Sequence, residues 1–315
     1  MDKSPPDRLS QVTELIVCPV CRGNRFRKLF EKKGRSFYVC QTCGLQKQHP
    51  LPSQAELAEY YESSYVSGLY EEFASVAYLK DLTAQQRLQE ASKFVPLRGR
   101  WLDVGTSTGN LVKALIERGV QAEGIELSQT AVHAAQREGL PVRAMMLSDL
   151  PQQHVYDCIT AYDLIEHVLD PAEFIRDVLL RLKVGGHLIM SLPNLAVLQR
   201  YLMGSRWYFY IPEEHLHYFT PKTMRRFLTG FGFDPVKIGA TYKPMTFDYA
   251  QAQFAEYNPL IHRCLSFVGR LTPAALRRYP LSVPIGEMRV VAKRMTHDVL
   301  VPEGADGILP SLVTG

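Results

Sequence analysis

The sequence predicts an α/β protein built on a doubly wound, mostly parallel β-sheet. A glycine-rich turn joins an apolar strand to a helix, and strands alternate with helices over residues 100–195. Four acidic residues each fall at the end of a predicted strand: Asp103, Glu126, Asp149 and Asp163. Because ligands of such sheets bind at the carboxyl ends of the strands, we expect a binding site at this edge.

The glycine-rich turn reads Asp-Val-Gly-Thr-Ser-Thr-Gly over residues 103–109 and leads from a strand at 100–104 into a helix. Glycine allows the backbone to approach a ligand closely and to adopt positive φ. Glu126 ends the next strand, at the place where an acid binds ribose hydroxyls in nucleotide-binding folds. The turn therefore predicts a nucleoside site.

A dinucleotide fingerprint starting at Gly105 would need glycine where Ser107 and Asn110 stand, and a Gly-Lys-Ser/Thr phosphate loop is also missing. The turn instead resembles motif I of class I S-adenosylmethionine (SAM) methyltransferases, with serine replacing the middle glycine. A glycine-rich turn unrelated to SAM stays open, as does a turn role for Asp149. The resemblance implies that SAM is bound by Asp103, Gly105, Thr106, Gly109, Glu126, Asp149 and Ala161.

Later segments extend the resemblance. Residues 156–168 resemble the fourth-strand motif of the quinone-methyltransferase-like branch of this family. Residues 234–238 read as a sixth strand, and residues 287–293 would be the seventh, which is antiparallel in the family. The resemblance implies a seven-stranded Rossmann-like methyltransferase sheet, with helical cap insertions at 195–220 and 241–286.

Two Cys-x2-Cys pairs near the N-terminus predict a small zinc ribbon with the ligands Cys18, Cys21, Cys40 and Cys43. Four protein ligands leave no position for water, so we expect a structural zinc ion. Two disulfides are the alternative, but the N-terminus does not read as a signal peptide, which favours a reducing cytoplasm. Cys158 and Cys264 lie in apolar runs, and we expect both to be buried and inert.

The composition describes a globular protein, since 46% of the 315 residues are hydrophobic and 22% are charged. The net charge of +4 is too small to argue for a polyanionic partner, and no apolar stretch is long enough for a transmembrane segment. We expect a cytoplasmic protein. Its predicted parts are a disordered 1–12, a zinc ribbon at 13–50, a helical lid or linker at 51–96, a SAM-dependent methyltransferase domain at 97–296 and a disordered tail at 297–315.

The insertion at 241–286 is rich in aromatic and apolar residues, and we expect it to cap the active site or to form the face of a homodimer. A membrane-surface role is a further alternative. It arises because apolar residues alternate with arginines along this segment: Phe254, Leu260, Ile261, Leu265, Phe267 and Val268 with Arg263 and Arg270.

Methyl transfer needs a group that removes a proton from the acceptor, and histidine suits this role because its pKa lies near neutrality. Residues 214–219 resemble a motif of sugar methyltransferases, including zinc-containing C-methyltransferases of deoxysugar biosynthesis. The resemblance implies that His215 and Glu214 are catalytic, with Glu214 orienting the ring. A structural role for His215, or a catalytic role for His167 or His217, is the alternative.

The leading hypothesis is a SAM-dependent methyltransferase that acts on a small-molecule acceptor, a hydroxyl of a sugar or secondary metabolite. C-methylation of a keto-sugar is in doubt because the large C-terminal domain of those enzymes is missing. An RNA methyltransferase that grips its substrate with the basic ribbon, and a non-catalytic SAM-fold protein, are further alternatives. Nucleic acid is disfavoured because the aromatic insertions favour an enclosed pocket over an open groove.

Overall fold

The structure is a computed structural model that describes residues 16–57, 59–60, 74–152, 156–257 and 259–295. The predicted disordered ends, 1–12 and 297–315, lie outside the described residues, as do residues 61–73 of the predicted lid.

A seven-stranded sheet forms the centre of the molecule, with the strand order β10-β13-β8-β7-β4-β5-β6. Strands β6, β5, β4, β7 and β8 run parallel to one another, and β13 runs antiparallel to both β8 and β10. The strand order reverses between β4 and β7, which places the expected ligand site at their carboxyl ends. The strands are β4 (Arg100–Val104), β5 (Gln121–Glu126), β6 (Val142–Ala144), β7 (Tyr156–Tyr162), β8 (Leu182–Pro193), β10 (Phe233–Ala240) and β13 (Glu287–Arg294). The predicted fold class is confirmed.

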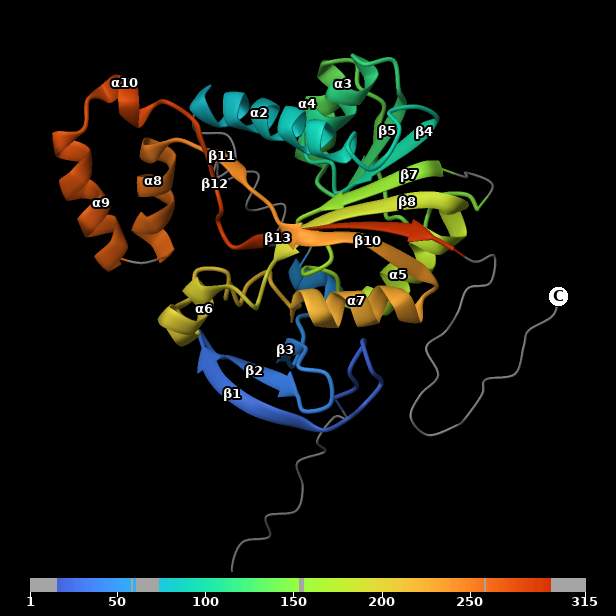
Figure 1. Ribbon diagram of the computed structural model, residues 1–315, viewed down its shortest axis with the longest axis horizontal. Helices are drawn as coiled ribbons and strands as arrows, with labels where there is room; N and C mark the ends of the chain where they lie inside the picture. Colours follow the sequence, from blue (N-terminus) through green and yellow to red (C-terminus); the bar gives the residue numbers. More distant parts are fainter. Residues whose placement is uncertain (1–15, 58, 61–73, 153–155, 258, 296–315) are drawn as a thin grey trace, which may run out of the picture.

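Helices cover both faces of this sheet and give a three-layered domain (Figure 1). One face is covered by α2 (Ala74–Ala91), α3 (Asn110–Ile116) and α4 (Gln129–Arg137), and the other by α5 (Pro171–Arg181) and α7 (Pro221–Gly230). Two separate apolar clusters result, because each face of a parallel sheet must be buried.

The ribbon forms a second sheet, which a strand from the first insertion of the α/β domain completes. Its order is β1-β2-β3-β9, where β1 is Phe26–Lys32, β2 is Arg35–Cys40, β3 is Gln46–His49 and β9 is His217–Tyr218. Strand β9 belongs to the first insertion, which also contains α6 (Leu198–Met203) and a 3₁₀ turn, Gly204–Arg206. The ribbon therefore shares backbone hydrogen bonds with the segment that carries the predicted catalytic histidine.

The second insertion projects from the sheet as a helical arm (Figure 1). The arm consists of α8 (Phe247–Tyr257), α9 (Pro259–Leu271) and α10 (Ala274–Arg277), and it stands on a two-stranded sheet of β11 (Lys243–Met245) and β12 (Leu281–Val283). No described helix is both long and apolar enough to cross a membrane. Cys158 is buried as predicted, but the prediction for Cys264 is wrong. Cys264 is exposed because it lies on a face of α9 that does not pack against α8.

We expect Phe37→Ala to lower the free energy of unfolding by about 3–5 kcal/mol, the usual loss for a buried phenylalanine. Phe37 is fully buried. Its ring stacks on the Phe30 ring with centres 4.6 Å apart and meets the Tyr210 ring of the insertion edge to face with centres 5.3 Å apart. Urea unfolding followed by circular dichroism measures the loss, and Phe37→Leu, which keeps most of the volume, should lose less. A loss below about 1 kcal/mol for Phe37→Ala would show that the ribbon does not pack on the insertion.

Candidate active site

The glycine-rich turn after β4 is tied to the neighbouring strand through its backbone. The amides of Gly105 and Thr106 donate to the carbonyl of Ile125, at 2.9 and 3.1 Å. Gly109 is the N-cap of α3 with φ of 79°, and a Cβ atom there would lie 2.8 Å from Leu140 Cδ1. The second glycine is thus required both by its backbone conformation and by the lack of space.

Glu126 shapes the turn as well as standing beside it. One carboxylate oxygen accepts from the amide of Ser107 at 2.9 Å, and the other accepts from Leu127 and Ser128 at 2.7 and 3.1 Å. Ser107, which replaces the middle glycine, has φ of 52°. The charged hydrogen bond to its amide compensates for this left-handed conformation.

The remaining residues predicted to bind SAM differ in their burial and in their hydrogen-bond partners. Asp103 is buried beneath the turn and accepts from the Thr160 hydroxyl at 2.6 Å. Asp149 accepts from the amide of Met146 at 3.0 Å, as a turn aspartate would. Ala161 packs in the core on β7, so its side chain faces the interior and not the edge of the sheet.

Two exposed apolar side chains beside these acids were missed from the sequence. Leu127 follows Glu126 directly and is 47% exposed, while Met146 bonds to Asp149 and is 44% exposed. The amide of Met145 donates to the carbonyl of Glu126 at 3.2 Å, which keeps the two loops adjacent. In the sequence, both leucine and methionine stand close to an acid that ends a strand, and this pattern could have identified them.

A buried cluster of two histidines and two glutamates lies beyond β7. The carbonyl of Glu166 accepts from the amides of Leu216 and His217 at 2.7 and 3.2 Å, and this brings His215 against His167 with ring centres 4.7 Å apart. Ligand atoms of Glu166, His167 and His215 all lie within 4.8 Å of one another. This donor set could hold a divalent ion or pass a proton.

The orientation of His215 determines which of its nitrogens is basic. Nδ1 lies 2.7 Å from the carbonyl of Phe209, and because a carbonyl can only accept, Nδ1 carries the proton. The lone pair is therefore on Nε2, which lies 4.0 Å from the Glu214 carboxylate. The group that orients the ring is thus the Phe209 carbonyl.

Burial favours the neutral forms of His215, His167 and Glu166. It lowers the pKa of His215 from 6.5 to about 4 and lowers the pKa of His167 further below its usual value. Burial also raises the pKa of Glu166 well above its usual range, and Glu166 Oε2 has no hydrogen-bond partner among the described residues. His217 faces another way, with Nε2 3.3 Å from the carbonyl of Leu169, which suits the structural alternative.

A network of partly buried ions, also missed from the sequence, surrounds Asp163. Its carboxylate accepts from Arg87 on α2 at 2.6 Å and from Lys243 on β11 at 2.8 Å. Burial alone would raise the pKa of Asp163, but the two cations hold it well below its usual range. Lys243 also binds Glu287 at 2.7 Å, and burial raises the pKa of Glu287 to about 7.

This network lines a small pocket between α2, β11 and the carboxyl ends of β7 and β8. Its wall includes Arg87, Tyr162, Ser191, Lys243 and Glu287. The Arg87 guanidinium lies 4.3 Å from the centre of the Tyr162 ring. The lid helix and the arm thus both contribute cations to the edge where SAM and an acceptor would meet.

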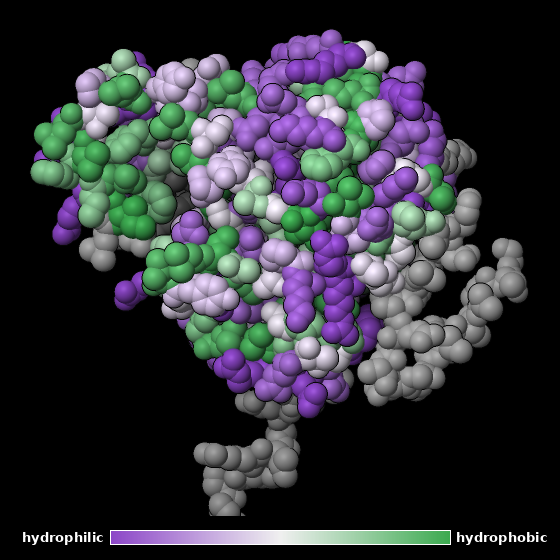
Figure 2. All heavy atoms as spheres, in the orientation of Figure 1, coloured by the Kyte–Doolittle hydropathy of each residue, from purple (hydrophilic) through white to green (hydrophobic). Residues whose placement is uncertain are grey.

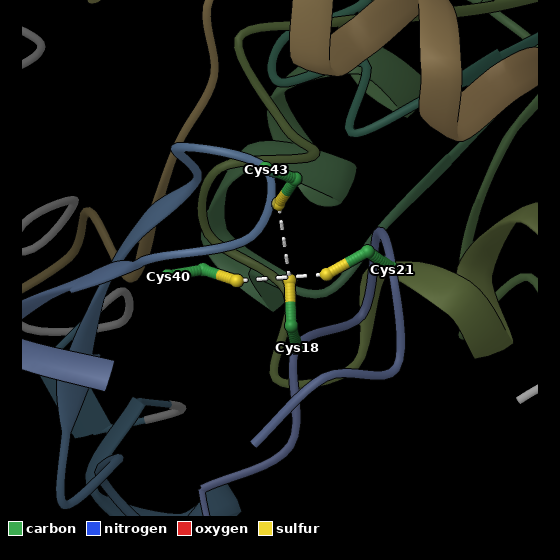
Figure 3. A group of neighbouring side chains, drawn as sticks. All are labelled: Cys18, Cys21, Cys40 and Cys43. Carbon is green, nitrogen blue, oxygen red and sulfur yellow. Dashed lines mark hydrogen bonds between the residues drawn. The ribbon is translucent and has the colours of Figure 1, made fainter. Parts of the chain in front are cut away.

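The four cysteines of the ribbon converge on one point (Figure 3). Their sulfurs lie within 4.8 Å of one another, with Cys18 and Cys43 at 3.5 Å and Cys21 and Cys40 also at 3.5 Å. Sulfurs around a tetrahedral zinc, each about 2.3 Å from the metal, lie about 3.8 Å apart, so the set fits that ion. All four are free cysteines.

The chain matches a family profile described as a methyltransferase domain over residues 76–238, about half of its length. The ubiquinone biosynthesis O-methyltransferase of Marinobacter nauticus is 28% identical over 194 residues, which are 56% of this chain and 82% of the relative. The enzyme of the same name from Ralstonia nicotianae is 26% identical over 191 residues, which are 56% of this chain and 80% of the relative.

Among solved structures, the fold is similar to magnesium protoporphyrin IX methyltransferase from Synechocystis with bound SAH. The TM-score is 0.52 at 15% identity, covering 77% of this chain and 100% of that one. The profile, the sheet order and the glycine-rich turn agree, and the chain belongs to the family of methyltransferase domains as a SAM-dependent methyltransferase.

Proposed function

We propose that this enzyme transfers the methyl group of SAM to a hydroxyl of a small molecule, with His215 as the general base. The observation that carries the proposal is the hydrogen bond from His215 Nδ1 to the carbonyl of Phe209. It leaves the basic Nε2 in a buried cluster beyond the carboxyl end of β7, where acceptors bind in this class of sheet.

Because His215 is a weak base, the proposed mechanism requires an acceptor hydroxyl that is relatively acidic. A base whose pKa is about 4 removes a proton from a phenol, whose pKa is about 10, far more readily than from a less acidic sugar alcohol. The names of the relatives, ubiquinone biosynthesis O-methyltransferases, also support an aromatic hydroxyl. The motif at 214–219 supports a sugar hydroxyl, so the two acceptors need to be compared directly.

When bound, SAM supplies the electrophilic methyl group, and the remaining work falls to residues of this chain. We propose that the glycine-rich turn and Glu126 hold the nucleoside and that Leu127 and Met146 pack on the adenine. Glu214 and His167 lie next to the base and would stabilise its protonated form. Arg87 and Lys243 supply positive charge near the reacting groups.

Several basic side chains of the ribbon bind other groups of the protein, which argues against the RNA alternative. Lys32 donates to the carbonyl of Tyr210 at 2.7 Å, and Lys33 pairs with Glu213 at 2.6 Å. Arg35 pairs with Glu56 at 3.6 Å. These charges are directed toward other parts of the protein, which reduces the basic surface left for a phosphate backbone.

We expect Glu126→Ala to weaken SAM binding by about 10–100-fold, the usual cost of losing hydrogen bonds to a charged group. The change removes the acceptor for Ser107 and the proposed ribose ligand together. Isothermal titration calorimetry measures the affinity. Glu123→Ala is the matched control, since Glu123 lies on the same strand but bonds to Arg143 at 2.6 Å and away from the turn. Equal affinities for the two variants would place SAM elsewhere.

We expect His215→Ala to lower turnover by about 10²–10⁴ in single-turnover assays and to leave SAM affinity unchanged. The wild-type rate should stay flat as the pH falls from 8 to 6, roughly, because a pKa of about 4 keeps the imidazole neutral there. It should fall only as the pH approaches 4. Assays with a catechol and with a sugar acceptor distinguish the two hydroxyls. Full single-turnover rate in His215→Ala would make the histidine structural, and loss of wild-type activity in EDTA would favour a metal in the cluster.

We also propose that Cys18, Cys21, Cys40 and Cys43 bind one structural zinc ion. The hydrogen bond with Cys43, followed by burial, raises the pKa of the Cys18 thiol, so four thiolates this close need a cation to coexist. Gln48 of the ribbon donates to the carbonyl of His215 at 2.7 Å.

We therefore expect Cys43→Ser to release the metal and to lower turnover, while SAM affinity changes little. Elemental analysis counts the zinc, and Cys264→Ser is the control because that thiol is exposed and far along the chain from the ribbon. Recovery of a metal-free protein with two disulfides from reducing conditions would contradict the zinc site. A metal-free Cys43→Ser variant with normal turnover would show that the ribbon does not support His215.

A further inference from the structure

Both insertions expose apolar side chains on one side of the molecule. Nineteen large hydrophobic side chains are exposed among the described residues, and nine of them belong to α6 and to the segment from α9 to β12. Leu202 is 77% exposed, Leu271 is 74% and Phe267 is 66%. Figure 2 shows hydrophobic surface over the arm and over α6 along the same edge. We call this surface the arm face. It comprises Leu198, Tyr201, Leu202, Phe267, Val268, Leu271, Leu276, Tyr279 and Leu281.

The two sides of α9 differ in what they contact. One side packs against α8, where His262 Nδ1 lies 3.0 Å from the carbonyl of Gln251 and Gly269 gives room to Phe247. The opposite side carries Arg263, Phe267, Arg270 and Leu271 at spacings of four, three and one, which place them on one helical stripe. Within the described residues, this stripe is exposed.

Charge on the arm face has one sign. Residues 259–283 contain four arginines and no acidic residue, and residues 195–212 contain two arginines and no acidic residue. The chain as a whole has 32 acidic residues in 315, so this absence is local. Arg277 pairs with Asp248 of α8 at 3.5 Å, whereas Arg263, Arg270 and Arg278 are exposed.

We infer that the arm face docks on the surface of an anionic lipid bilayer. Apolar side chains that are interspersed with arginine and free of acidic residues bind such surfaces, because the chains enter the headgroup region while the cations contact lipid phosphates. Tyr201 and Tyr279 are placed as interfacial aromatic residues. This inference goes beyond the proposed reaction and does not depend on it.

A second copy of the chain fits this surface less well. A two-fold symmetric dimer brings the same patch of both subunits together, so the arginines of one subunit would face a second patch that carries arginines. The two segments offer no carboxylate to neutralise them. An anionic bilayer supplies the missing negative charge.

Docking would also place the pocket close to the membrane. Strand β11 pairs with β12 at the base of the arm, and its first residue, Lys243, lines the pocket. An acceptor that partitions into lipid would then reach the enzyme directly from the bilayer surface.

Flotation of the full-length protein with vesicles tests the inference. The protein should bind phosphatidylcholine vesicles that contain roughly one-third phosphatidylglycerol, bind pure phosphatidylcholine weakly, and lose affinity as salt rises. Arg263→Glu/Arg270→Glu and Phe267→Asp/Leu271→Asp should each weaken binding at least about tenfold. Lys222→Glu/Arg226→Glu on α7 is the matched control, because both side chains are exposed on another part of the molecule.

Calorimetry with SAM on each variant confirms that the changed protein is folded. Equal binding to the two kinds of vesicle, or equal loss in the α7 control, would overturn the inference. Sedimentation velocity measures whether the protein is a monomer or a dimer. A dimer that dissociates in Phe267→Asp/Leu271→Asp, with no vesicle binding by the wild type, would assign the arm face to a second copy and overturn the inference as well.

Discussion

The position of His215 depends on a two-residue strand that is held from both sides. On one side, β9 pairs with β3 of the ribbon, with Lys47 opposite His217. On the other side, the carbonyl of Glu166 accepts from the amides of Leu216 and His217. Each contact involves only a few backbone groups, and so short a strand is not stable without partners on both sides. Together they place His215 against the loop that follows β7.

Burial of this segment creates polar groups that the ribbon helps to satisfy. Gln48 Nε2 donates to the carbonyls of Pro212 and His215, at 3.0 and 2.7 Å, and the Tyr218 hydroxyl donates to the same His215 carbonyl at 2.8 Å. A buried carbonyl left without a partner costs about 1–3 kcal/mol. In the proposed function the ribbon would therefore support the active site, and binding of the proposed zinc ion would be coupled to the position of His215.

Local sequence patterns predicted the parts of the structure that depend on neighbours in the chain. Strands β4 and β5, the left-handed Gly109 and the paired cysteines all follow from short spacings. The pairing of β3 with β9 joins residues about 170 positions apart, and nothing in a two-residue strand signals its partner. The bonds from Arg87 and Lys243 to Asp163 also join residues far apart in the chain, 76 and 80 positions, so the ionic pocket could not be predicted. The prediction for Cys264 failed for a related reason: an apolar run of sequence can lie on an exposed helical face as well as in a core.

Burial of the histidine cluster links the proposed acceptor to the architecture. Excluding water from His215 lowers its pKa and so weakens the base, while the same exclusion would shield the site from bulk water. A weak base that is neutral before the reaction accepts a proton readily only from an acidic acceptor, and a phenol is far more acidic than an alcohol. Aromatic acceptors of that kind are also apolar, and an enzyme that binds them benefits from an apolar surface near its active site. The exposed side chains of α6 and α9 lie on the two insertions of the sheet, and the first insertion also carries His215, so the proposed base and the apolar surface belong to the same parts of the chain.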